Sequence, residues 1–166
     1  FSIDAEAQLA NKPSMMNPDD TASNTGHKHD DRMMNTKAEI ENATEVNVKA
    51  KMKKMIDEYQ QLKNALVSDN FEASKSHYKH VNALLSEMAL SNFQNIENFN
   101  SIDDLREEFI ALSEQMISAV EKSNPMKETI YIQRCPMADS GEGARWLSFS
   151  EEIRNPYYGA SMLKCG

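Results

Sequence analysis

Apolar residues recur every three or four positions in three stretches of the chain, which is the spacing of one face of an α-helix. The stretches cover residues 48–66, 71–88 and 102–120. Pro125 follows the third stretch and prevents a helix from continuing. The three apolar faces comprise Val48, Met52, Met55, Tyr59, Leu62 and Leu66; Phe71, Tyr78, Val81, Leu84, Leu85 and Met88; and Ile102, Leu105, Phe109, Leu112, Met116 and Val120.

Capping signals support the second and third helices. Asp69 followed by Glu72, and Ser101 followed by Asp104, both have the form of an amino-terminal cap. The first two helices are separated by a very short turn, so we expect them to pack antiparallel. Residues 89–100 are polar and rich in asparagine, and we expect a turn or an irregular helix there.

The periodicity changes after Pro125. Residues 129–133 are β-branched and aromatic, and residues 144–148 form a second candidate strand after a Gly-Glu-Gly turn. These segments predict a hairpin. The predicted fold is therefore mainly α, an antiparallel three- to four-helix bundle with a small β-hairpin-like appendage at the carboxy end.

The amino-terminal part of the chain divides into two further segments. Residues 1–10 are compatible with a strand running into a short helix, which suggests a remnant of a preceding domain. Residues 11–45 contain few large apolar side chains and many polar residues, so we predict a flexible linker with His and Met residues. Residues 46–166 would form the helical domain.

Composition and charge exclude several classes of function. The chain has 18 basic and 26 acidic residues, a net charge of −8, and no basic stripe with interleaved aromatics, so nucleic acid is not an expected partner. No apolar stretch approaches the roughly 20 residues needed to span a bilayer, so direct membrane insertion is not expected. No phosphate loop, dinucleotide fingerprint or partnered nucleophile occurs, and we do not expect an enzyme.

The candidate chemistry lies in the last part of the chain. Cys135 and Met137 are two residues apart, which places both on one side of an extended segment, and Met162 and Cys165 suit one side of a helical turn. Thiolates and thioethers are soft ligands that favour Cu(I) or Ag(I) over Mg, Ca or Mn. Convergence of the two segments would give a metal site, with no bond-making catalysis.

Two other interpretations of the cysteines remain open. A disulfide between Cys135 and Cys165 would close a loop of about 30 residues and contribute about 3 to 4 kcal/mol by the chain-entropy argument. The thiols could also be buried and inert. A third candidate metal, Zn(II), would need His residues in addition to the two thiols.

Weaker metal ligands lie elsewhere in the chain. A tract with His27, His29, Met33 and Met34 could capture metal from solution, or it could be a solvated segment without a role. His77 and His80 are three positions apart on the second helix, where solvent contact is the commoner outcome. The remaining candidate thioether is Met116; with Met52, Met55 and Met88 it lies on an apolar helix face, where methionine usually serves packing.

Several motifs resemble a known family. They are Tyr59-Gln60-Gln61-Leu62-Lys63-Asn64-Ala65-Leu66-Val67, Leu112-Ser113-Glu114-Gln115-Met116, Cys135-Pro136-Met137-Ala138, Gly143-Ala144-Arg145-Trp146-Leu147-Ser148, Ile153-Arg154-Asn155-Pro156-Tyr157-Tyr158-Gly159 and Met162-Leu163-Lys164-Cys165-Gly166. Together they resemble the helical domain, formerly of unknown function, at the carboxy end of some heavy-metal efflux adaptors. The resemblance covers residues 48–166. Longer relatives carry an extra His- and Trp-containing helix where this chain has only residues 89–100.

Residues 1–18 are similar to the end of the membrane-proximal domain in copper/silver adaptors, the membrane fusion proteins of resistance-nodulation-division pumps. The resemblance implies a periplasmic location and Cu(I) or Ag(I) as cargo. It also implies an inner-membrane efflux pump and an outer-membrane channel as partners of the parent adaptor, with a periplasmic metallochaperone as a further candidate.

Overall fold

The computed structural model describes residues 32–90 and 98–166, with backbone alone for residues 32–40. Lys37–Gly166 forms one compact unit. The segment 1–31 lies outside the described residues, as do 91–97. The predicted domain remnant and the first part of the predicted linker therefore lie outside the described residues.

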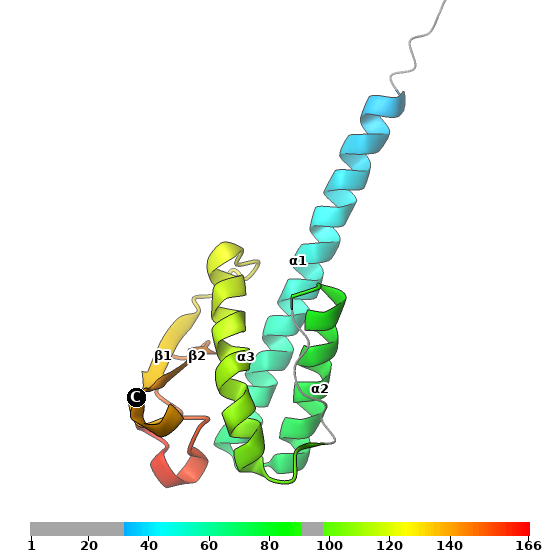
Figure 1. Ribbon diagram of the computed structural model, residues 1–166. Coiled ribbons are helices and arrows are strands. Elements are labelled where there is room, and N and C mark those ends of the chain that lie inside the picture. The colour runs from blue at the N-terminus through cyan, green and yellow to red at the C-terminus, as the bar shows by residue number, and fades with distance from the viewer. Residues whose placement is uncertain (1–31, 91–97) are drawn as a thin grey trace, which may run out of the picture. The chain divides into compact units, whose positions relative to one another are not determined.

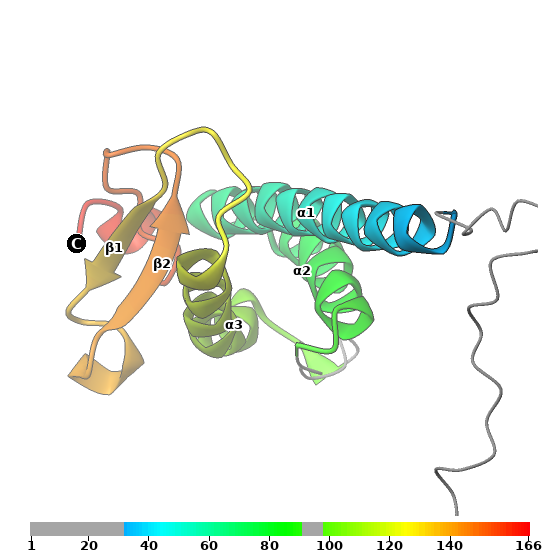
Figure 2. The ribbon, with the colours of Figure 1, turned by 90° about the horizontal axis from the view of Figure 1, so that it is seen from above.

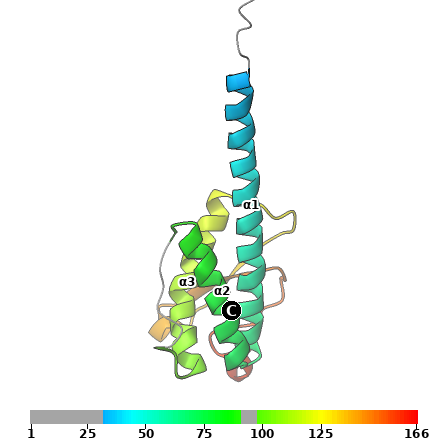
Figure 3. The same ribbon diagram turned by 90° about the vertical axis from the view of Figure 1, so that its right-hand side faces the viewer.

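Within the described residues, three α-helices form the main layer of the fold. They are α1 (Arg32–Val67), α2 (Phe71–Glu87) and α3 (Ile102–Lys122), and they lie alongside one another in two perpendicular views (Figures 1 and 3). A two-stranded antiparallel sheet follows, made of β1 (Tyr131–Cys135) and β2 (Ala144–Ser148). The predicted mainly α fold with a small hairpin is confirmed.

The hairpin packs on the side of α3 that faces away from α2 (Figure 2). Its register pairs Gln133 with Trp146 and Cys135 with Ala144. After β2 the chain continues through turns and a short 3-10 helix, η3 (Gly159–Met162), to its carboxy end. The fold therefore leaves the last residues beside the end of β1.

A continuous apolar core joins the helices to the hairpin. Tyr59 of α1 stacks on Phe109 of α3 with ring centroids 5.2 Å apart, and Tyr157 lies between Phe109 and Trp146, 5.8 Å from each. Trp146 and Phe109 are fully buried. Tyr157 is buried as well, so these aromatic rings join α3 to β2 within the core.

Polar side chains of α1 hold β2 in place. The Tyr59 hydroxyl accepts from the Leu147 backbone N–H at 3.2 Å and bonds the Ser113 hydroxyl at 2.7 Å. Gln60 donates to the Leu147 carbonyl at 3.1 Å. Lys63, buried and with its pKa lowered by that burial and by Arg154, donates to Ser148 at 3.3 Å. The polar residues that interrupt the apolar face of α1 thus dock the hairpin.

Two helix starts differ from the sequence expectation. α1 begins at Arg32, well before Val48, because no Gly or Pro interrupts the sequence between Arg32 and Val67. Residues 41–50 are exposed, and Val48 is not part of the core. At α2 the capping residue is Asn70, whose side chain accepts from the Ala73 N–H, and not Asp69. The predicted capping box of Ser101 and Asp104 on α3 is confirmed.

Candidate metal site

Cys135 and Cys165 lie side by side although 30 positions separate them, and their Sγ atoms are 3.5 Å apart. Cys135 is the last residue of β1 and is fully buried, whereas Cys165 follows η3 and is partly exposed. Both are free thiols. The hairpin and the carboxy-terminal turns therefore bring two soft donors together at one edge of the domain.

The turn after β1 aims backbone donors at the Cys135 sulfur. The N–H groups of Met137 and Ala138 both hydrogen-bond to it. Tyr158 donates its hydroxyl to the Met137 carbonyl at 2.8 Å, which ties this turn to the segment before η3. Two backbone N–H groups of the Cys-Pro-Met-Ala turn thus hydrogen-bond to one sulfur, which favours the thiolate form of Cys135 over the neutral thiol.

Asn155 joins the two cysteine segments. Its side-chain amide donates to the Cys165 carbonyl at 2.9 Å, and its side chain also hydrogen-bonds to Cys135. Its Oδ1 accepts from the Tyr157 N–H at 2.8 Å, and its backbone N–H donates to the Leu163 carbonyl at 2.8 Å. Since Asn155 is fully buried, these bonds fix the carboxy-terminal residues against β1.

The two thiols differ in acidity. Burial opposes ionisation of Cys135, but the hydrogen bonds from Met137, Cys165, Asn155 and Ala138 outweigh it and hold the pKa of Cys135 below its ordinary value. The pKa of Cys165 is raised by its hydrogen bond to Cys135, by burial and by the charge of Cys135. Cys135 is therefore the first to ionise, and its thiolate accepts from the Cys165 thiol.

The two predicted thioethers lie on the same segments as the cysteines. Met137 stands two residues after Cys135 and is 55% exposed, while Met162 is 37% exposed and its carbonyl accepts from the Cys165 N–H at 3.1 Å. Across the described parts of the chain, no His, Asp or Glu ligand atom joins the two thiols in a group of three. The side-chain ligands that the structure brings together at this edge are thus the two thiols.

The weaker candidates do not join this site. Met116 is fully buried in α3 as part of the apolar core, which agrees with the packing interpretation. His27 and His29 lie outside the described residues, as do the side chains of Met33 and Met34. His77 and His80 bond Glu58 instead of approaching the thiols, so the described part of the chain offers no third ligand for the Zn(II) alternative that required His.

Sequence reasoning did not predict the hydrogen bonds that Asn155 and Tyr158 make at this site. Both lie in the Asn-Pro-Tyr-Tyr-Gly segment, which predicts a turn but not the long-range partners of its side chains. One feature of the sequence pointed to such contacts: the segment that returns toward the cysteines contains an Asn and two Tyr residues, all of which can form hydrogen bonds. Their contacts depend on tertiary structure, which spacing along the chain does not reveal.

Residues 55–128 match a family described as "Protein of unknown function (DUF3347)". The matched range contains the end of α1 with α2 and α3, and it stops before Cys135. Comparison with curated proteins and with solved structures found no match. Within the described residues, no helix is both long and apolar enough to cross a membrane.

Proposed function

We propose that this domain binds one Cu(I) or Ag(I) ion through Cys135 and Cys165, with Met137 or Met162 as a further ligand, and passes it on by ligand exchange. The observation that carries the proposal is the pairing of two free thiols 3.5 Å apart at one edge of the domain. Thiolate and thioether ligands select soft monovalent ions over hard cations.

The spacing of the sulfurs suits a shared ion. With a metal–sulfur bond of about 2.3 Å, two ligands of a trigonal or tetrahedral ion lie about 3.8 to 4.0 Å apart. The observed separation of 3.5 Å would need to open by only a few tenths of an ångström. The backbone turn and Asn155 already hold both segments, so little ordering is required on binding.

Unequal acidity and exposure give a route for exchange. Cys135, buried and of lowered pKa, supplies a thiolate anchor, while the partly exposed Cys165 gives up its proton as the ion binds. The exposed thioethers of Met137 and Met162 are weaker ligands at the rim, where an incoming donor can displace them. An ion held in this way can be accepted from a carrier and released to another protein.

The wider setting rests on the resemblance to heavy-metal efflux adaptors. In that setting the domain would work in the periplasm as part of an adaptor between an inner-membrane pump and an outer-membrane channel, with a metallochaperone as one source of the ion. The tract predicted before the domain, with His27 and His29 ahead of α1 and Met33 and Met34 at its start, would raise the local metal concentration by tethering. Ion transfer would then require no catalytic residue.

A second candidate function is a disulfide-stabilised module that binds another protein of the efflux assembly. A groove of about 810 Å³ favours this alternative, because it lies between α3 and the carboxy-terminal turns and is lined by charged and aromatic residues such as Arg106, Glu107, Tyr157 and Tyr158. The two sulfurs are also near enough to form a disulfide by oxidation after a small shift.

Mass measurement of the protein purified without reductant, before and after thiol alkylation, distinguishes the disulfide from the two free thiols.

Anaerobic Cu(I) titration against a chromophoric chelator tests the metal proposal. We expect the wild type to bind one ion tightly, and Cys135→Ser to bind at least about a hundredfold more weakly because the anchoring thiolate is lost. Met162→Ala should weaken binding by about tenfold. Met126→Ala, a partly buried methionine outside the site, is the matched control and should leave the affinity unchanged.

Circular dichroism must accompany the titration, since a variant that unfolds would also lose the ion. Wild-type affinity in Cys135→Ser with helicity unchanged would refute the site. A native, metal-free protein in which the two cysteines are fully joined would favour the protein-binding alternative.

A further inference from the structure

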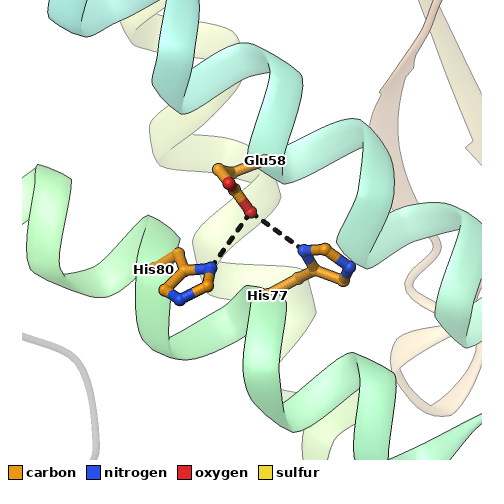
Figure 4. Close-up of side chains that lie close together, drawn as sticks. All are labelled: Glu58, His77 and His80. Carbon is orange, nitrogen blue, oxygen red and sulfur yellow. Dashed lines mark hydrogen bonds and ion pairs between the residues drawn. The ribbon is translucent and has the colours of Figure 1, made fainter.

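A second cluster of metal-ligating side chains joins α1 to α2, away from the two thiols. Glu58 projects from α1, and His77 and His80 project from α2 toward it (Figure 4). The Glu58 Oε2 atom lies 2.9 Å from His77 Nδ1 and 3.3 Å from His80 Nδ1. One ligand atom from each residue falls within 4.8 Å of the other two.

The two distances from Glu58 to the histidines are close to the ligand–ligand distances around a tetrahedral ion. With metal–nitrogen and metal–oxygen bonds of about 2.0 to 2.1 Å, two ligands of such an ion are separated by about 3.3 to 3.4 Å. The observed separations of 2.9 and 3.3 Å would need only side-chain adjustments to admit an ion. Two imidazole nitrogens and one carboxylate oxygen also leave a fourth position for water or an exchanging ligand.

Charge and exposure at the cluster suit a cation. The hydrogen bond from His77 is the main cause that lowers the pKa of Glu58, with His80 adding to it against the effect of burial, so the carboxylate is ionised at neutral pH. Glu58 and His77 are partly buried, whereas the His80 side chain is 55% exposed. An ion can therefore enter from solvent beside His80 and meet a fixed negative charge.

The type of ligand separates this cluster from the thiol pair. Imidazole and carboxylate favour borderline divalent ions such as Zn(II) over Cu(I), which favours sulfur. We propose that Glu58, His77 and His80 form a site for a divalent transition-metal ion, with Zn(II) as the probe, that links α1 to α2. This site is independent of the proposed Cu(I) or Ag(I) site, and either can exist without the other.

The competing explanation is a purely structural pair of hydrogen bonds, in which one carboxylate oxygen accepts from both imidazoles. Both explanations use the same contacts in the metal-free protein, but they differ in what Zn(II) does. A metal site requires both Nδ1 atoms to lose their protons and bond the ion. Structural hydrogen bonds alone would leave the imidazole nitrogens unaffected by added Zn(II).

Zn(II) titration of the full chain followed by imidazole nitrogen NMR tests the proposal without disturbing the thiols. We expect the Nδ1 signals of His77 and His80 to shift together and to saturate at one Zn(II) per chain for this site. Unchanged imidazole signals at saturating Zn(II) would overturn the proposal. A thiol-bound Zn(II) ion would not move them, so failure of this site is distinguishable from failure of the sulfur site.

A second measurement uses the Cys135→Ser/Cys165→Ser background, in which no thiol can bind the ion. There Zn(II) should raise the thermal unfolding midpoint, and His77→Gln or Glu58→Gln should lower Zn(II) affinity by at least about tenfold. Lys79→Gln, which changes an exposed residue between the two histidines, is the matched control and should bind as its parent does. Equal Zn(II) binding with and without His77→Gln would also overturn the proposal.

Discussion

Asn155 is the residue on which the geometry of the thiol pair most depends. It is fully buried and its side chain bonds both cysteine segments, the Cys165 carbonyl directly and the Cys135 sulfur as one of several hydrogen-bonding groups. Removal of a buried hydrogen-bonding side chain leaves its partners without bonds in the protein interior. The same substitution removes one of the interactions that lower the pKa of Cys135.

We therefore predict that Asn155→Ala lowers the free energy of unfolding by about 1 to 3 kcal/mol and raises the pKa of Cys135. Urea denaturation measures the first effect. The pH dependence of Cys135 alkylation, resolved from Cys165 by peptide mass spectrometry, measures the second. Asn64→Ala on the exposed side of α1 is the control and should change neither quantity. An unchanged alkylation profile in Asn155→Ala would show that its amide does not act on the sulfur.

The connection between α1 and α2 also holds the carboxy-terminal segment. Asp69 has a positive φ of 54°, a conformation that Asp and Asn tolerate better than most residues. Its carboxylate bonds the Arg106 guanidinium of α3, and it accepts from the Ala160 N–H of η3 at 3.2 Å. Gly159 also has a positive φ, and a Cβ there would meet Asp69 and Arg106, so glycine is required for this close approach.

This contact predicts a pH-dependent contribution to stability. The bond from Arg106, and then the Ala160 N–H, hold the pKa of Asp69 below its ordinary value of 3.8. A carboxyl whose pKa is lower in the folded state adds stability above its unfolded pKa and loses it as pH falls through the folded value. Asp69→Asn keeps a residue that tolerates positive φ but removes the charge beside Arg106. It should lower the free energy of unfolding at pH 7 by about 1 kcal/mol, and the difference in stability between the wild type and this variant should narrow below about pH 4.

Urea denaturation of wild type and Asp69→Asn at neutral and acidic pH provides the measurement. Asp103→Asn is a matched control, because Asp103 pairs with the same Arg106 but is 80% exposed. Its loss of stability should stay below about 0.5 kcal/mol. A difference in the free energy of unfolding between wild type and Asp69→Asn that is the same at all pH values would mean that the charge of Asp69 does not contribute to stability.

The elements of the fold were predictable where a local pattern decides them. The apolar period located all three helices, and the β-branched and aromatic run placed β2 on residues 144–148, as observed, with β1 displaced by two residues toward Cys135. The start of α1 was not predictable from its apolar face, because residues 41–50 are helical but exposed. Local propensity sustains the helix there without burial.

The candidate sites were predictable only in part, for a related reason. Soft-ligand chemistry identified Cys135 and Cys165, but the turn donors and Asn155 act through contacts between distant segments. Likewise His77 and His80 share a helical face by spacing alone, whereas Glu58 joins them only once α1 and α2 pack together. Side-chain type and period therefore locate candidate ligands, and tertiary packing decides which of them come together.

At the scale of the whole domain, the proposed ion would connect two parts of the chain that the core holds separately. Cys135 belongs to the hairpin that docks on α1 through Tyr59, Gln60 and Lys63, whereas Cys165 lies in the terminal segment held by Asn155. An ion that binds both thiols binds the folded protein far better than the unfolded chain. Its binding must therefore increase the stability of the domain.

We predict that Cu(I) buffered at about one hundred times its dissociation constant adds about 2.7 kcal/mol to the free energy of unfolding. Thermal unfolding under anaerobic conditions, followed by circular dichroism, should show a higher midpoint for the wild type. Cys165→Ser should lose most of this gain while keeping its metal-free midpoint close to that of the wild type, since Cys165 is partly exposed. An equal gain in Cys165→Ser would show that Cys165 is not a ligand of the ion.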